Sequence, residues 1–166
     1  MIGKTEAIVL NKVKYGDNSF IVNFYSLDFG RFAAIIRIPK TSTSGIKPAV
    51  LSPLNIVETE VKMKDSRNIQ SVKYCNRNAN LDNLSTDIFK SCIAQFIAEI
   101  LVKTIKEEEA NPQMYGLIKK TILLLNDSSK NISDIHLYFL RDFAVVAGFG
   151  ITDNFVEETA FFNIRE

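Results

Sequence analysis

The first eighty residues alternate between apolar and polar side chains, whereas the residues after them repeat apolar side chains at helical spacing. A period of two is typical of half-buried strands, and a period near 3.6 is typical of amphipathic helices. The pattern therefore predicts an α+β protein, with a β-rich domain over 1–80 followed by an α-helical domain over 81–166.

Five short strands are expected in the first domain. Three of them form a meander over 5–38, where two glycine-containing turns separate the strands. A long polar loop over 39–53 precedes a fourth strand at 54–64 and a fifth at 69–76. Five strands in roughly 75 residues, with a long connection before the fourth, suit a small closed barrel. An OB-fold β-barrel is the leading candidate, and an SH3-like barrel is the alternative.

Three helices are expected in the second domain. The first is long and begins among three candidate N-caps, which are Asp82, Ser85 and Asp87. It ends at the acidic triplet 107–109, which we interpret as a solvated helix end. Asn111-Pro112 begins the second helix. Ser133 is the expected cap of the third helix, which Gly148 terminates.

The net charge also changes sign near residue 80. Residues 1–80 carry 12 Lys and Arg against 6 acids, a balance of +6, and residues 81–166 carry 8 against 13, a balance of −5. A basic β-domain joined to an acidic helical domain suggests one surface for a polyanion and another for proteins.

Other patterns exclude several classes of function. The sequence has no secretory signal and no apolar run long enough to span a bilayer, so the expected location is the cytoplasm, without a membrane partner. Cys75, Cys92 and His136 lack the spacing of a zinc site, so no metal or cofactor is expected. Neither a nucleophile motif nor a phosphate-binding glycine loop occurs, so we do not expect an enzyme.

The main candidate site is a set of cations in the first domain. Its members are Lys12, Lys14, Arg31, Arg37, Lys40 and Lys47. Cations along one groove bind phosphates through counterion release, and the aromatic side chains of OB barrels stack on bases. The aromatic candidates are Tyr15, Phe20, Tyr25, Phe29 and Phe32. For Phe20, Phe24 and Phe32 the barrel core is the better interpretation.

Several short segments occur in the order and spacing of a known family. They are TEAIVL at 5–10, YGD at 15–17, Tyr25-Ser26, Phe29-Gly30, HLYFL at 136–140, Gly148-Phe149 and FFNIRE at 161–166. Together they resemble the RecO family of recombination mediators, and Bacteroidetes-type members in particular. The resemblance covers essentially the whole chain.

The resemblance implies an OB-fold and a helical domain that act in DNA repair without bond-breaking chemistry. Such proteins bind single- and double-stranded DNA, anneal complementary strands and help load recombinase onto gaps covered by single-strand-binding protein. The implied protein partners are RecR and the acidic C-terminal tail of single-strand-binding protein. The implied location is the cytoplasm, in association with the nucleoid.

Two departures from the family pattern limit these implications. Family members continue well beyond a position like Glu166, so the chain is expected to lack a C-terminal portion. The loop after the third strand carries only three cations, Arg37, Lys40 and Lys47, where the family is often densely basic. Strong DNA binding by this chain alone is therefore not implied.

Two interpretations concern protein partners. A groove in the helical domain flanked by Lys119, Lys120 or Arg141 is a candidate site for the acidic tail. The alternative to DNA binding is an interaction module whose barrel docks a RecR-like partner and binds little DNA itself.

Overall fold

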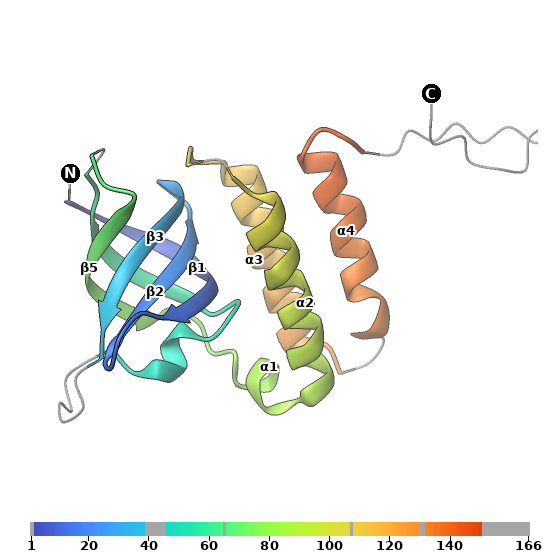
Figure 1. Ribbon diagram of the computed structural model, residues 1–166. Helices are drawn as coiled ribbons and strands as arrows, with labels where there is room; N and C mark the ends of the chain where they lie inside the picture. Colours follow the sequence, from blue (N-terminus) through green and yellow to red (C-terminus); the bar gives the residue numbers. More distant parts are fainter. Residues whose placement is uncertain (1, 39–45, 65, 107, 130–131, 151–166) are drawn as a thin grey trace, which may run out of the picture.

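A five-stranded barrel lies beside a layer of helices in the computed structural model (Figure 1). The structure describes residues 2–38, 46–64, 66–106, 108–129 and 132–150. Lys40 lies outside these residues, as does the FFNIRE segment at 161–166.

The five strands close into a barrel. They are β1 (Ile2–Lys14), β2 (Ser19–Ser26), β3 (Gly30–Arg37), β4 (Ile56–Lys62) and β5 (Ile69–Arg77). Their order around the barrel is β1-β2-β3-β5-β4, and every neighbouring pair is antiparallel except β3 and β5. This is the OB-fold that the strand pattern predicts, not the SH3-like alternative.

The interior of the barrel is filled by the inward positions of each strand. On β3, burial alternates strictly, and Phe32, Ala34 and Ile36 point inward. Phe32 stacks on Phe24 of β2, with ring centroids 5.2 Å apart. Phe20 is half-buried against the same cluster, so the core interpretation of these three phenylalanines is confirmed.

Four helices follow the barrel. They are α1 (Asp82–Thr86), α2 (Ile88–Thr104), α3 (Pro112–Asp127) and α4 (Ile135–Val146). Short 3-10 turns occur at η1 (Pro48–Leu51) and η2 (Ile132–Asp134).

The helix ends follow most of the predicted caps. The Asp87 carboxylate accepts hydrogen bonds from the first amides of α2, so the expected long helix is divided into α1 and α2 at this residue. Asn111 caps α3, and Gly148 has the left-handed φ of +86° that stops a helix. The prediction that Ser133 caps the last helix is wrong, because Ser133 lies within η2 and α4 begins at Ile135.

One hydrophobic core joins the barrel to the helices. Its barrel members are Ile8, Leu10, Tyr25, Leu54 and Ile56. Helices α2, α3 and α4 complete this core with residues such as Leu101, Ile118 and Phe139, all at most 1% exposed. The secondary structure changes near residue 80 as expected, but the two parts are packed as one body.

Candidate nucleic-acid interface

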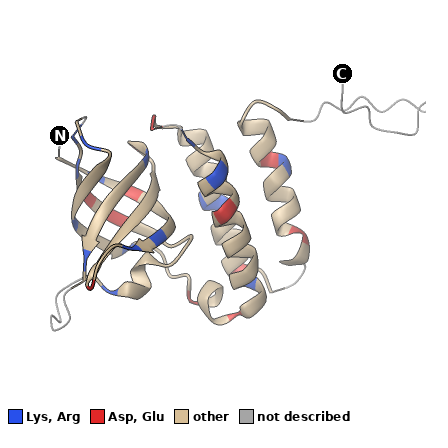
Figure 2. Cartoon of the chain, in the orientation of Figure 1, with Lys and Arg blue, Asp and Glu red and all other residues tan. Residues whose placement is uncertain are grey.

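Lys and Arg residues occur at both ends of the barrel, where they are coloured blue along the chain in Figure 2. Arg37 ends β3 and pairs with Ser19 at the start of β2, beside the turn that follows Lys14. Lys12 donates a hydrogen bond to the carbonyl of Pro48, the residue after Lys47, at 3.2 Å. The structure therefore brings four of the predicted cations to one end of the barrel. We call Lys12, Lys14, Arg37 and Lys47 the basic end.

The basic end is divided between two faces of the sheet. Lys14 pairs with Phe20, whose side chain points inward, and the Lys12 ammonium lies 5.9 Å from the Phe20 ring centroid. Arg37 is an outward position, because it follows the inward Ile36. Side chains of adjacent residues in a strand point to opposite faces, so Arg37 lies on the other face of the sheet from Lys12 and Lys14, and these cations do not line one groove.

Arg31 occupies a position that the sequence did not predict. Its guanidinium donates hydrogen bonds to the carbonyls of Val102, at 2.9 Å, and Ile105. These carbonyls lie at the C-terminal end of α2, where a positive charge is favourable. Arg31 thus ties β3 to the helices, and we leave it out of the candidate DNA surface.

The aromatic candidates for base stacking differ in exposure. Tyr15 is 62% exposed beside the basic end and can stack on a base. Tyr25 is only 2% exposed and stacks on Tyr115 of α3 at 6.4 Å, so its suggested role as a base platform is wrong. Phe29 and Phe32 pack into the barrel interior, and neither is an exposed platform.

A groove opens where β3 and β5 separate. Its volume is about 540 Å³. Its described lining is Ile35, Arg37, Ile46, Ser71, Val72, Lys73, Tyr74, Cys75 and Asn76. Among these described lining residues, Arg37 is the one cation that the sequence predicted to bind DNA. Tyr74, which is 39% exposed, is the aromatic residue of the lining.

Four further cations of the barrel fall into two groups, two in ion pairs and two beside a smaller cavity. Lys73 lies 3.9 Å from Glu60, and Arg77 lies 3.1 Å from Asp82. Lys64 and Arg67 are exposed at the opposite end from the basic end, where they and Arg31 line a smaller cavity of about 220 Å³. This second basic region is also lined by Glu108, which weakens its attraction for phosphate.

Two of the three cations predicted to bind an acidic tail are already paired with carboxylates. The Lys119 ammonium lies 2.6 Å from the Glu6 carboxylate of β1, and Arg141 pairs with Asp142 at 2.7 Å. Lys120 is exposed on α3. Lys119 thus points to the barrel and contributes to the junction, so it is not available on an outer groove.

Glu6 is the centre of a polar network at that junction. Its carboxylate accepts hydrogen bonds from Tyr115 at 2.9 Å, Lys119 at 2.6 Å and Asn78 at 2.6 Å. Burial alone would raise the pKa of Glu6, but these three donors and the charge of Lys119 outweigh it and hold the pKa below its ordinary value. Burial and the hydrogen bond to Glu6 raise the pKa of Tyr115.

The described residues contain no cluster of three or more His, Cys, Asp or Glu side chains placed to hold a metal ion. Among the helices that the structure describes, none has the length and apolar character required to cross a membrane.

Sequence reasoning did not find Ser71, Tyr74 or Asn76, which line the groove. The sequence carries one signal in β5, since the apolar residues Val72 and Cys75 are three residues apart, and the structure shows that both contact the barrel interior. Two inward residues at a spacing of three break the period of two and indicate a β-bulge between them.

Two family models match the chain. The model for the N-terminal part of recombination protein O matches residues 1–78, and the model for its C-terminal part matches residues 85–152. These two ranges correspond to the barrel and to the helices.

Several curated relatives carry the name DNA repair protein RecO. The protein from Phocaeicola vulgatus is 29% identical over 99% of this chain and 68% of its own length. The protein from Azobacteroides pseudotrichonymphae is 32% identical over 90% of this chain and 62% of its own length. The Bacteroides fragilis protein is 31% identical over 84% of this chain and 58% of its own length, so the chain spans about three fifths of these relatives. With both halves of the chain matched in order, the protein belongs to the RecO family.

Proposed function

We propose that this chain is a non-enzymatic mediator of DNA repair that binds single-stranded DNA at the basic end of its OB barrel. The observation that carries the proposal is the gathering of Lys12, Lys14, Arg37 and Lys47 at one barrel end, next to the exposed Tyr15. Membership of the RecO family and the names of the relatives support the repair role.

The physical basis of this binding is the release of counterions from phosphates. For single strands, the logarithm of affinity falls with the logarithm of salt concentration by about 0.7 for each phosphate neutralised. Four contacts at the basic end would thus weaken binding about 50-fold between roughly 50 and 200 mM salt. A flat response over that interval would contradict the proposal.

The assignment of residues is tested by removing two charges. Anisotropy of a fluorescein-labelled thymidine 12-mer measures affinity for the whole chain at several salt concentrations. Arg37→Gln together with Lys47→Gln should lower the salt slope by about 1.4, because two phosphate contacts are lost. Lys103→Gln on α2, which removes one exposed charge paired with Glu99, is the control and should leave the slope unchanged. An unchanged slope in the double variant would remove the basic end from the proposal.

Annealing of strands, loading of recombinase and association with the nucleoid are proposed on the family resemblance, as are the partners RecR and the tail of single-strand-binding protein. Lys120 and Arg141 remain the proposed contacts for that acidic tail. Annealing of two complementary oligonucleotides, with and without the chain, tests the first of these activities. Wild-type protein that leaves the annealing rate unchanged would contradict it.

Exposed apolar side chains favour a protein-interaction module as a second candidate, with the helices and not the barrel as its docking surface. Large apolar side chains are exposed on the helices, including Ile88 at 73%, Phe89 at 71% and Tyr138 at 55%. Exposed apolar surface is typical of protein interfaces. This candidate predicts a complex with RecR that forms without DNA and weak binding to oligonucleotides. A pull-down with and without DNA separates it from the first proposal.

A further inference from the structure

The groove beside the basic end results from a short strand pairing. Strands β3 and β5 pair through only three residue pairs, Ala33 with Ile69, Ala34 with Gln70 and Ile35 with Ser71. Beyond Ile35 and Ser71 the two strands separate, and the groove of about 540 Å³ occupies the space between them. This volume lies within the range of roughly 300–1,000 Å³ that is usual for small-molecule sites.

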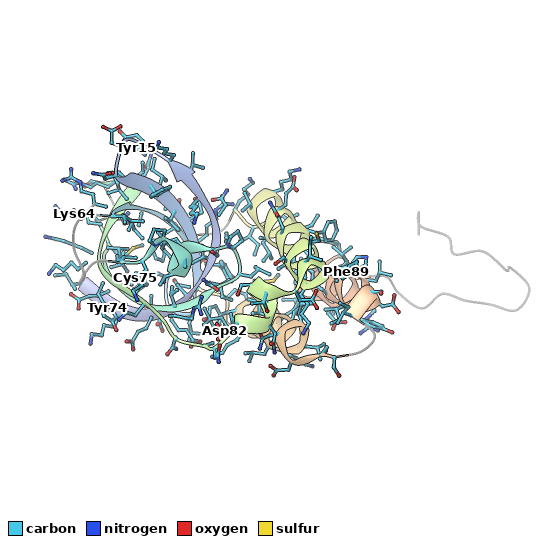
Figure 3. The ribbon with its side chains drawn as sticks, turned by 90° about the horizontal axis from the view of Figure 1, so that it is seen from below. Tyr15, Lys64, Tyr74, Cys75, Asp82 and Phe89 are labelled. Atoms are coloured by element: carbon cyan, nitrogen blue, oxygen red, sulfur yellow. The ribbon has the colours of Figure 1, made fainter. Side chains whose placement is uncertain are left out.

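A bulge shapes the β5 wall of the groove. Glu60 of β4 pairs with Tyr74 and the next residue, Val61, pairs with Val72, so Lys73 is the extra residue of β5. Bulges redirect side chains and are enriched beside functional sites. Figure 3 shows Tyr74 at the outside of the barrel and Cys75 in its interior. The bulge thus places an aromatic ring and a cation on the same groove wall.

The chemistry of the groove matches a nucleotide. Ile35, Ile46 and Val72 supply apolar surface, Tyr74 supplies a ring, and Ser71 and Asn76 supply hydrogen-bonding groups. Such a lining suits the faces and edges of a base, since bases stack on aromatic rings and form hydrogen bonds at their edges.

Charge favours an anion at the groove rim. Arg37 and Lys73 line the groove, and its described lining contains no Asp or Glu. The pair between Lys73 and Glu60 is long, at 3.9 Å, and the side chain of Lys73 is 59% exposed. Exposed pairs of this kind contribute little, so Lys73 can exchange its partner for a phosphate.

We propose that this groove takes one unpaired base of a DNA strand, which stacks on Tyr74 while its flanking phosphates contact Arg37 and Lys73. The inference rests on the proposed function and adds a preference for single strands. A paired base lies inside the helical stack and cannot enter the groove without being extruded.

The test combines two proteins with two DNA strands. The strands are a labelled thymidine 12-mer and a strand of equal length whose central nucleotides are abasic, so that both present the same phosphates. Tyr74→Ala should weaken binding of the thymidine strand about 5-fold or more, as expected when one stacked base is lost. The same variant should bind the abasic strand as the wild type does. Tyr74→Phe retains the ring and should restore binding of the thymidine strand.

Two controls keep the outcome interpretable. Phe89→Ala removes an exposed aromatic ring on α2, which lies far from the barrel (Figure 3). This variant should leave the affinity for both DNA strands unchanged. Ser71→Trp fills the groove from β5 and should reproduce the effect of Tyr74→Ala.

The outcomes separate the two proposals. If Tyr74→Ala weakens binding to both strands equally, or to neither, the proposed base site is overturned. Salt-dependent binding at the basic end can still hold in that case. If the wild-type chain binds neither strand at low salt, the proposed function fails and the base site fails with it.

Discussion

Replacing Glu6 with alanine would remove the acceptor that Tyr115, Lys119 and Asn78 share at the junction of barrel and helices. The side chain of Glu6 is 19% exposed and that of Lys119 is 38% exposed, so the network is partly shielded from water. The Tyr115 hydroxyl lies in the same junction, and that residue is only 3% exposed. Without Glu6 this hydroxyl loses its charged acceptor.

The expected loss of stability follows from these contacts. A hydrogen bond to a charged group contributes about 1.5–3 kcal/mol, and the Tyr115 bond should lie near the lower end because Glu6 keeps some contact with water. The ion pair with Lys119 is half-exposed and adds about 0.5–1 kcal/mol after screening by solvent. Glu6→Ala should therefore lower the free energy of unfolding by about 2–3 kcal/mol.

Urea denaturation followed by circular dichroism at pH 7 measures this loss. The double variant Glu6→Ala with Lys119→Met should show a coupling energy of about 1 kcal/mol, as expected for residues in contact. Lys103→Met breaks the exposed pair between Glu99 and Lys103 within α2 and should cost less than about 0.5 kcal/mol. A Glu6→Ala loss no larger than that of Lys103→Met, or a coupling energy of zero, would refute the reasoning.

Two further predictions concern titration and thiol chemistry. The folded protein lowers the pKa of Glu6 below its ordinary value of 4.5, so its contribution is complete above pH 4.5 and is lost as the pH falls through the folded pKa. The difference in unfolding free energy between wild type and Glu6→Gln should therefore shrink below pH 4.5, and a difference that stays constant to pH 3 would contradict this. Burial raises the pKa of the Cys75 thiol to about 12, whereas Cys92 is exposed, so a disulfide reagent at pH 8 should modify Cys92 alone until urea unfolds the chain. Modification of two thiols at equal rates in the folded state would show that Cys75 is accessible.

The strands and helix caps could be predicted because each depends on residues close in sequence. The alternation of β3 assigns Phe32, Ala34 and Ile36 to the interior from the pattern alone. Asp87 and Asn111 cap helices through bonds that reach only two or three residues ahead. Such local signals are present in any window of the sequence that contains them.

The roles of Arg31 and Tyr25 could not be predicted, because they depend on which outward face the helices cover. In β1 the consecutive residues Ile8, Val9 and Leu10 are all buried, which removes the alternation. Val9 contacts the barrel interior, while Ile8 and Leu10 contact the core shared with the helices. A continuous apolar run indicates a strand covered on both faces, but it does not identify what covers the second face.

The core shared by barrel and helices has a practical consequence for gene truncation. A fragment ending at residue 80 would open to water the five barrel side chains Ile8, Leu10, Tyr25, Leu54 and Ile56, each at most 2% exposed in the whole chain. Uncovering a large apolar side chain costs about 1.5–3 kcal/mol, and a typical domain has only about 5–15 kcal/mol of stability to lose. The isolated barrel should therefore aggregate or unfold. If such a fragment fails to bind DNA, the failure would reflect its misfolding and would not test whether the barrel surface binds DNA.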